Sequence, residues 1–257
     1  MITAAALCPA PPLLARELTG ADPVIPELRQ ACHAAAAALV AGAPDLIAVV
    51  GAATQTRAWD PDTGLDLSPY APALGIGSAG TARPAGGPAT AGCDANAPAG
   101  AAPPLPLGLG SRLLDQAGYA GRRVLRSIGH DEPPEACAAL GARLAGAGPR
   151  VALLVMADGS ARRGVKAPGY LDPRSAPFDA EVERAIRAGD MTALLALGPG
   201  LARALLATGR PAWQVLAGAA DGQRLASTIR YRGDPFGVAY LVASLTIPGQ
   251  AIACFLR

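Results

Sequence analysis

The sequence predicts an α/β protein with a three-layer architecture: an open, mostly parallel or mixed sheet with helices on both faces. Short apolar runs, such as Leu46–Gly51 and Val151–Met156, alternate with longer alanine-rich stretches. A continuous apolar run of this length is typical of a strand that is buried on both faces of a sheet. Regular alternation of strands and helices builds β-α-β units. We therefore expect a single α/β domain over residues 1–257.

The first half of the chain supplies most of this alternation. The apolar run Ile2–Leu7 predicts a first strand. A helix is expected over Pro26–Val40, because a proline stands near its first turn and Gly42 follows its end, which is the usual asymmetry of helices. The expected elements that follow are a strand at Leu46–Gly51, a strand at Arg123–Ile128, a helix over about 134–145 and a strand at Val151–Met156.

The second half begins with a helix that we expect Ser175 to cap and Gly189 to close. A second helical stretch is expected to run to about residue 207. The strands expected after it are Trp213–Ala217, Leu225–Tyr231, Gly237–Leu245 and Ala251–Leu256. Hairpins among these strands would give the sheet antiparallel edges.

The segment Tyr70–Gly108 is rich in proline, glycine and alanine and predicts a flexible insertion. Within it, Gly75–Gly80 matches the glycine pattern of dinucleotide-binding loops. That pattern requires a strand before it and a helix after it, whose N-terminus binds the pyrophosphate. The sequence that follows cannot form such a helix, so we interpret the match as chance.

Composition excludes several classes of function. The net charge is +2, with both signs interspersed, which does not favour nucleic-acid binding. No apolar run has the length of a membrane span. The five cysteines are scattered and odd in number, which favours free thiols in a reducing compartment, so we expect a cytoplasmic protein. Assembly as a homo-oligomer and pairing with a partner subunit remain open.

The stretch from Met156 to Asp179 is the strongest candidate for a binding site. Open α/β sheets bind ligands where strands end in loops at their carboxyl edge. The polar side chains of this loop include Asp158, Ser160, Arg162, Arg163, Lys166 and Asp172, and Lys166 is the only lysine of the chain. Arginine and lysine in such a loop favour a phosphate or carboxylate ligand. The alternative is a solvated loop in which Asp172, Arg174 and Asp179 form internal ion pairs.

The chain offers few candidates for catalysis by histidine, because His33 and His130 are its only two histidines. A nucleophilic site with Cys8 or Ser160 and His130 as base would require these residues to meet in space.

Four strings, in this order, resemble motifs of the class III extradiol ring-cleavage dioxygenase family, in particular its B-type subunits, which are related to the Memo-like proteins. Cys8–Leu14 (CPAPPLL) resembles the family's "PHPPLL" element. Leu46–Ala53 (LIAVVGAA) resembles its "VVIGPH" strand end, and Met156–Ala161 (MADGSA) resembles its "SGDLSH" loop. Asp234–Tyr240 (DPFGVAY) resembles its "PYGVGY" strand.

The resemblance implies the fold of these B-type subunits, but not the chemistry of the family. Active members hold Fe(II) with two histidines and a glutamate, and a further histidine acts as acid and base. This chain has Ala10 and Ala53 at the two ligand histidines and Ala161 at the acid–base histidine. For the glutamate, only Asp221 would be a stand-in.

We therefore expect no metal or other cofactor. The expected function is that of a pseudoenzyme or a protein that binds a small anionic ligand. Two alternatives stay open: a metal-independent hydrolase or lyase that uses Asp158, Ser160 and Lys166, and a residual Fe(II)-dependent ring-cleavage dioxygenase.

Overall fold

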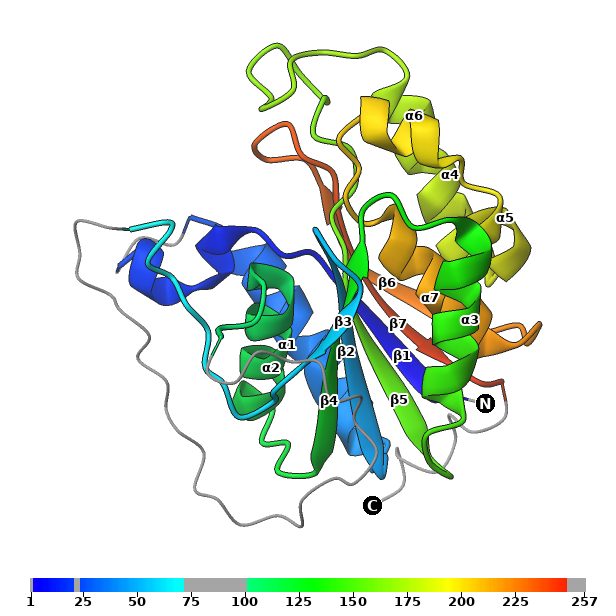
Figure 1. Cartoon of the computed structure of the whole chain (residues 1–257). Helices are drawn as coiled ribbons and strands as arrows, with labels where there is room; N and C mark the ends of the chain where they lie inside the picture. Colours follow the sequence, from blue (N-terminus) through cyan, green and yellow to red (C-terminus); the bar gives the residue numbers. More distant parts are fainter. Residues whose placement is uncertain (1, 21–23, 72–100, 249–257) are drawn as a thin grey trace.

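The computed structural model describes residues 2–20, 24–71 and 101–248, and it confirms the predicted α/β class. Seven helices pack on a seven-stranded mixed sheet in these parts of the chain (Figure 1). The strands are β1 (Ile2–Cys8), β2 (Leu46–Ala53), β3 (Arg57–Trp59), β4 (Arg122–Gly129), β5 (Val151–Met156), β6 (Ala226–Gly233) and β7 (Tyr240–Thr246). The helices are α1 (Pro26–Ala41), α2 (Leu105–Gln116), α3 (Pro134–Ala145), α4 (Ser175–Ala188), α5 (Met191–Leu195), α6 (Pro199–Ala204) and α7 (Arg210–Ala220).

The sheet has the order β3-β4-β2-β5-β1-β7-β6. Its centre, β4-β2-β5-β1, is parallel, while β3 at one edge and the β6–β7 hairpin at the other are antiparallel. The predicted antiparallel edge is therefore present at the C-terminal hairpin. The short edge strand β3 was not predicted, because three residues carry too little periodicity.

Alternate side chains of each central strand enter different cores. In β5, Leu154 and Met156 face the layer of α1 and α2, while Leu153 and Val155 face the layer that contains α3, α4, α5 and α7. Figure 1 shows the two helical layers on opposite sides of the sheet. Because both faces are covered, β1, β2 and β5 are apolar along most of their length.

The prediction of a strand at Trp213–Ala217 is wrong, because these residues lie in α7. Pro211 stands in the first turn of α7, which suits a helix. The helix is buried on nearly all sides, so its apolar residues form a continuous run rather than a stripe. Periodicity alone cannot separate such a buried helix from a buried strand.

The start of α4 also differs from the prediction. Ser175 is the first residue of the helix, the cap position is Arg174, and no side chain makes a capping hydrogen bond. Gly189 closes the helix in the left-handed conformation, as predicted.

Two other predictions fall wholly or mostly outside the described residues. Most of the segment 70–108, with the glycine pattern at Gly75–Gly80, lies outside the described residues, and α2 begins at Leu105. The strand expected at Ala251–Leu256 also lies outside them.

Candidate functional site

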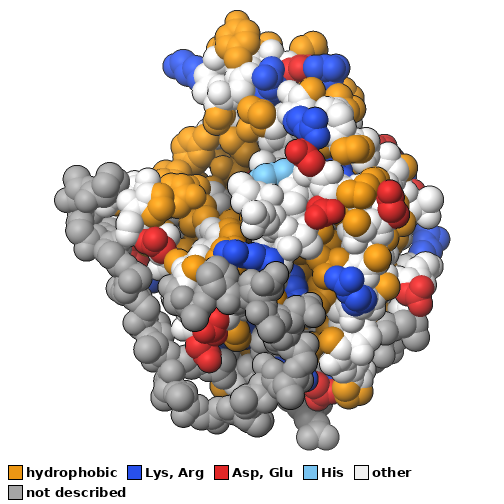
Figure 2. All heavy atoms as spheres, viewed as in Figure 1, with side chains coloured by type: hydrophobic (Ala, Val, Ile, Leu, Met, Phe, Trp, Pro, Cys, Tyr) orange, Lys and Arg blue, Asp and Glu red, His pale blue; other side chains and the backbone are white. Residues whose placement is uncertain are grey.

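The parallel strands end together at one edge of the sheet, and the chain leaves this edge in two directions. After β1 and β2 it enters the layer of α1 and α2, whereas after β5, which lies between them, it passes to α4 in the opposite layer. Open α/β sheets bind ligands at such a switch point. Figure 2 shows a hollow on this side of the molecule, with hydrophobic side chains gathered between the part that carries α6 and the part that carries α1 and α2.

Asp158 lies at this switch point, two residues past β5. Its Oδ1 accepts a hydrogen bond from the backbone N–H of Ala10 at 2.8 Å, so it links the ends of β5 and β1. Burial raises the pKa of the Asp158 carboxyl to about 6, although the Ala10 hydrogen bond acts in the opposite direction. A carboxyl with a pKa near neutrality can exchange a proton at physiological pH.

The three alanines of the resemblance make polar contacts only through their backbone. Ala10 donates to Asp158, and the carbonyl of Ala53 accepts from the N–H of His130 at 3.0 Å. Ala161 is bound through its N–H to the carbonyl of Leu205 at 3.0 Å. Their methyl side chains offer no electron pair to a metal ion.

Metal ligands do not assemble elsewhere in the described ranges either. No group of three or more His, Cys, Asp or Glu side chains there could hold a metal ion. Asp221, the stand-in for the glutamate, terminates α7. Gly209, just before α7, donates to the carbonyl of Asp158 at the carboxyl edge. Asp221 follows twelve residues later, so it lies about 18 Å from this edge along the helix axis.

The other residues of the predicted loop separate into three places. Ser160 is fully buried, and both its N–H and its Oγ bind Asp179, at 2.9 and 2.5 Å. Asp172 binds Arg174 through both carboxylate oxygens, which holds its pKa at about 2. Arg162 packs over Gly169, and Lys166 is exposed.

The structure thus brings Ser160, Arg163 and Asp179 together and leaves Lys166 apart. The proposed nucleophile pairs are not formed: Ser160 binds a carboxylate, and the buried Cys8 thiol faces the carbonyl of Cys32 at 4.0 Å.

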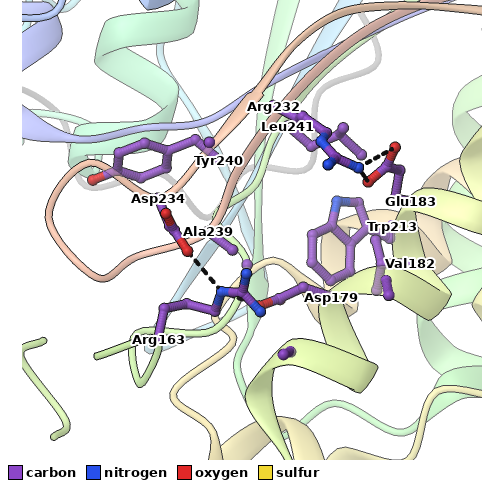
Figure 3. Close-up of a pocket in the computed structure, with 14 residues that line it drawn as sticks. Arg163, Asp179, Val182, Glu183, Trp213, Arg232, Asp234, Ala239, Tyr240 and Leu241 are labelled. Carbon is purple, nitrogen blue, oxygen red and sulfur yellow. Dashed lines mark hydrogen bonds and ion pairs between the residues drawn. The ribbon is translucent and has the colours of Figure 1, made fainter. Parts of the chain in front are cut away.

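A pocket of about 490 Å³ lies beside this loop, between α4, α7 and the β6–β7 hairpin (Figure 3). Sequence reasoning missed it, because its walls come from four separate segments. The lining residues are Gly159, Arg163, Ala176, Asp179, Ala180, Val182, Glu183, Trp213, Arg232, Gly233, Asp234, Ala239, Tyr240 and Leu241.

Local backbone pairing places Arg163 at this pocket. Gly159 and Ser160 pair with Ala239 just before β7, with two hydrogen bonds of 2.8 Å. A Cβ atom at Gly159 would lie 2.7 Å from that of Ala239 and 2.8 Å from Asp179 Oδ1, so only glycine allows this approach. The N–H of Arg163 then binds the carbonyl of Gly237 at 3.0 Å, and its side chain turns towards α4.

The carboxylates of the pocket all have partners. Asp234 accepts from Arg163 Nε at 2.9 Å, and Glu183 accepts from Arg187 and Arg232 at 2.7 and 3.0 Å. Burial raises the pKa of Asp179, an effect that its hydrogen bonds from Ser160 reduce. For Glu183, burial also favours the neutral form, but the two arginines outweigh it and the pKa is lowered.

Arg163 and Trp213 both carry N–H donors in the pocket that have no acceptor within the described residues. The Arg163 guanidinium bonds only through Nε, and its nearest approach to Asp179 is 3.8 Å. Trp213 is 1% exposed, and its indole Nε1 is buried without a hydrogen-bond partner. A site that keeps unused donors next to filled acceptors can bind an acceptor-rich ligand.

Comparisons with known proteins give a fold and no family. No family model matches the chain, and no curated protein matches it. Among solved structures, the uncharacterized protein JW3007 from Escherichia coli K12 has a similar fold, with a TM-score of 0.54 and 17% identity. The match covers 94% of this chain and 99% of that one. At this identity the likeness concerns the fold alone, and the link to the dioxygenases stays a prediction.

None of the helices in the described ranges combines the length and the apolar character that a bilayer crossing requires.

Proposed function

We propose that this chain is an iron-independent protein that binds a small organic anion, on a fold like that of the B-type subunits of extradiol dioxygenases. With respect to ring cleavage it would be a pseudoenzyme. The donor set supports the first part: methyl groups at Ala10, Ala53 and Ala161 cannot coordinate Fe(II), and a lone carboxylate such as Asp158 binds it weakly.

The observation that carries the second part is the state of Arg163 in the pocket. Its Nη1 and Nη2 groups make no hydrogen bond within the described residues, and about a quarter of its side chain is exposed (26%). Guanidinium groups bind carboxylates and phosphates through paired N–H donors. Arg163 therefore offers its free edge to an anion while Asp234 holds the opposite side of the group.

Titration of the purified protein with small organic acids, followed by thermal shift and calorimetry, tests this proposal. Arg163→Gln should weaken binding about tenfold or more, because it removes a charge-assisted contact. Arg184→Gln is the matched control, since Arg184 pairs with Glu181 on the surface of α4 and does not line the pocket. Equal binding by the two variants, or no binding of any anion by the wild-type protein, would contradict the proposal.

Metal analysis of protein purified without chelators tests the iron-independent part. The residual dioxygenase alternative requires close to one equivalent of bound iron. We expect far less.

One observation favours a second candidate function, a metal-independent hydrolase or lyase. Asp158 has its pKa near 6 at the switch point of the sheet. Ser160 and Lys166 do not join it, because Ser160 binds Asp179 and Lys166 is exposed. In this case Asp158 alone would transfer the proton, and Asp158→Asn would abolish turnover of any substrate found by screening.

A cytoplasmic location agrees with the cysteines: Cys8, Cys32 and Cys137 are buried free thiols. Self-association or a partner subunit remains part of the proposal, and analytical ultracentrifugation would measure it.

A further inference from the structure

We infer that the ligand of the Arg163 pocket is a small organic monocarboxylate, with its carboxylate between Arg163 and the indole N–H of Trp213 and its apolar body against β7. This inference rests on the proposed function and narrows it from small anions in general to one chemical class.

The hydrogen bonds already formed in the pocket favour a ligand that accepts hydrogen bonds. Asp179, Glu183 and Asp234 are already bound by serine or arginine donors, so a ligand has little to gain by donating to them. The unmatched groups of the pocket include the Nη atoms of Arg163 and Nε1 of Trp213, and these are donors. A buried N–H without a partner costs free energy that a ligand oxygen would recover.

The indole of Trp213 forms part of the pocket wall. Trp213 lies in the first turns of α7 and lines the cavity, although only 1% of its surface is exposed. In Figure 3 the indole and the Arg163 guanidinium both border the space in front of Asp179. Two side chains that carry unused donors thus line one cavity from different elements.

The acidic groups of the pocket select against a dianion. Asp179 and Asp234 flank the guanidinium of Arg163, at 3.8 and 2.9 Å from its Nε. A phosphate dianion placed on the free edge of Arg163 would be repelled twice as strongly by these carboxylates as a monoanion. A carboxylate keeps the bidentate geometry with half the charge.

The remaining wall selects an organic body. Val182, Ala239 and Leu241 present aliphatic groups. A cavity of about 490 Å³ is within the range of small-molecule sites. An inorganic anion would leave most of this volume and all of the aliphatic surface without a partner.

The test compares three probes by calorimetry: cyclohexanecarboxylate, its neutral amide cyclohexanecarboxamide, and inorganic phosphate. The carboxylate should bind at least tenfold more tightly than the other two. Trp213→Phe, which keeps an aromatic ring and removes the N–H, should weaken carboxylate binding about fivefold to tenfold. Unchanged affinity in Trp213→Phe would overturn the role of the indole.

Fluorescence gives a second readout in case Trp213→Phe does not fold. The chain has two tryptophans, so Trp59→Phe leaves Trp213 as the only indole. Its emission should shift with cyclohexanecarboxylate and stay constant with the amide or phosphate. A shift with phosphate of equal affinity would refute the monocarboxylate while leaving anion binding intact, and binding of none of the probes would refute both the inference and the proposed function.

Discussion

At the scale of single residues, Asp158 shows how burial sets the chemistry of a side chain. Its position after an apolar strand is visible in the sequence, and the loop was predicted on that basis. Within the described residues, the one hydrogen bond to its side chain comes from Ala10, 148 residues away in the chain. The raised pKa follows from this packing of β5 against β1, which no local pattern reports.

The pH dependence of stability should reveal this carboxyl. Its pKa rises from 3.8 to about 6 on folding, so its favourable contribution is complete below pH 3.8 and is lost as the pH rises through 6. Asp158→Asn cannot titrate and still accepts the Ala10 hydrogen bond. Between pH 3 and 7, the free energy of unfolding of the variant should therefore gain roughly 3 kcal/mol relative to that of the wild type, at about 1.4 kcal/mol per pKa unit.

Urea unfolding at several pH values measures this difference. Parallel curves for the two proteins would show that Asp158 titrates normally in the folded state.

The buried position and hydrogen bonds of a second polar side chain, Arg210, could not be predicted from the sequence. Arg210 is 1% exposed, and its guanidinium donates to the carbonyls of Glu132 and His130 and to Oε1 of Gln214. In the sequence it is one of many arginines. Only the folded chain shows that it joins the loop after β4 to the start of α7.

Arg210→Met should lower the free energy of unfolding by about 2–4 kcal/mol, because it leaves the buried Gln214 amide and two partly buried carbonyls without this donor. Arg203→Met is the control, since Arg203 forms an exposed ion pair with Asp131 and should cost less than about 1 kcal/mol. Denaturant midpoints with unchanged slopes would report both effects. Equal losses of unfolding free energy in the two variants would mean that the hydrogen bonds of Arg210 stabilise the fold no more than an exposed ion pair does.

At the scale of elements, a helix or strand could be predicted where its pattern of apolar residues was visible in the sequence. The strands β1, β2, β4 and β5 and the helices α1, α3 and α4 were predicted within a few residues, because apolar runs and glycine or proline at helix ends mark them. The prediction was wrong for α7, because a helix that is buried on nearly all sides does not show a separate apolar face in its sequence. The charged loop was located correctly, yet its ion pairs depend on β6 and α4, which approach it only in three dimensions.

The contact between α3 and α7 explains why two glycines stand in these helices. A Cβ atom at Gly141 would lie 2.0 Å from the carbonyl oxygen of Val215, and one at Gly218 would lie 2.2 Å from that of Ala138. Alanine favours a helix over glycine, so the glycines serve close approach rather than helix formation.

Gly141→Ala should therefore destabilise the protein by at least about 2 kcal/mol, because backbone atoms must move to relieve the clash. Gly146→Ala at the end of α3 is the control: its nearest new contact is 3.6 Å, so it should be nearly neutral. Thermal denaturation of both variants compares them directly. A neutral Gly141→Ala would show that the two helices can separate without loss.

At the scale of the whole molecule, the order of strands decides which distant segments meet. The motifs that resemble the dioxygenase family occur in family order, which led to the expected fold, and the sheet confirms the α/β class. The sheet also places β5 between β2 and β1, so Asp158 lies between the segments that carry Ala53 and Ala10. The pocket beside Trp213 could not be predicted from the sequence, because it forms only where α4, α7 and the β6–β7 hairpin come together in the folded chain.

This arrangement predicts that a metal site can be installed. Neighbouring strands lie about 4.8 Å apart, so the ends of β2 and β1 are about 10 Å apart with β5 between them. Histidines at positions 10 and 53 would extend from both sides towards Asp158 and complete two imidazoles and one carboxylate, a set that binds divalent transition metals. The double variant Ala10→His/Ala53→His should therefore bind one equivalent of Ni²⁺ or anaerobic Fe²⁺ at least tenfold more tightly than either single variant, as measured by calorimetry. Adding Asp158→Asn should remove the gain, and a folded double variant that binds no better than the single ones would mean that the three segments do not converge on one site.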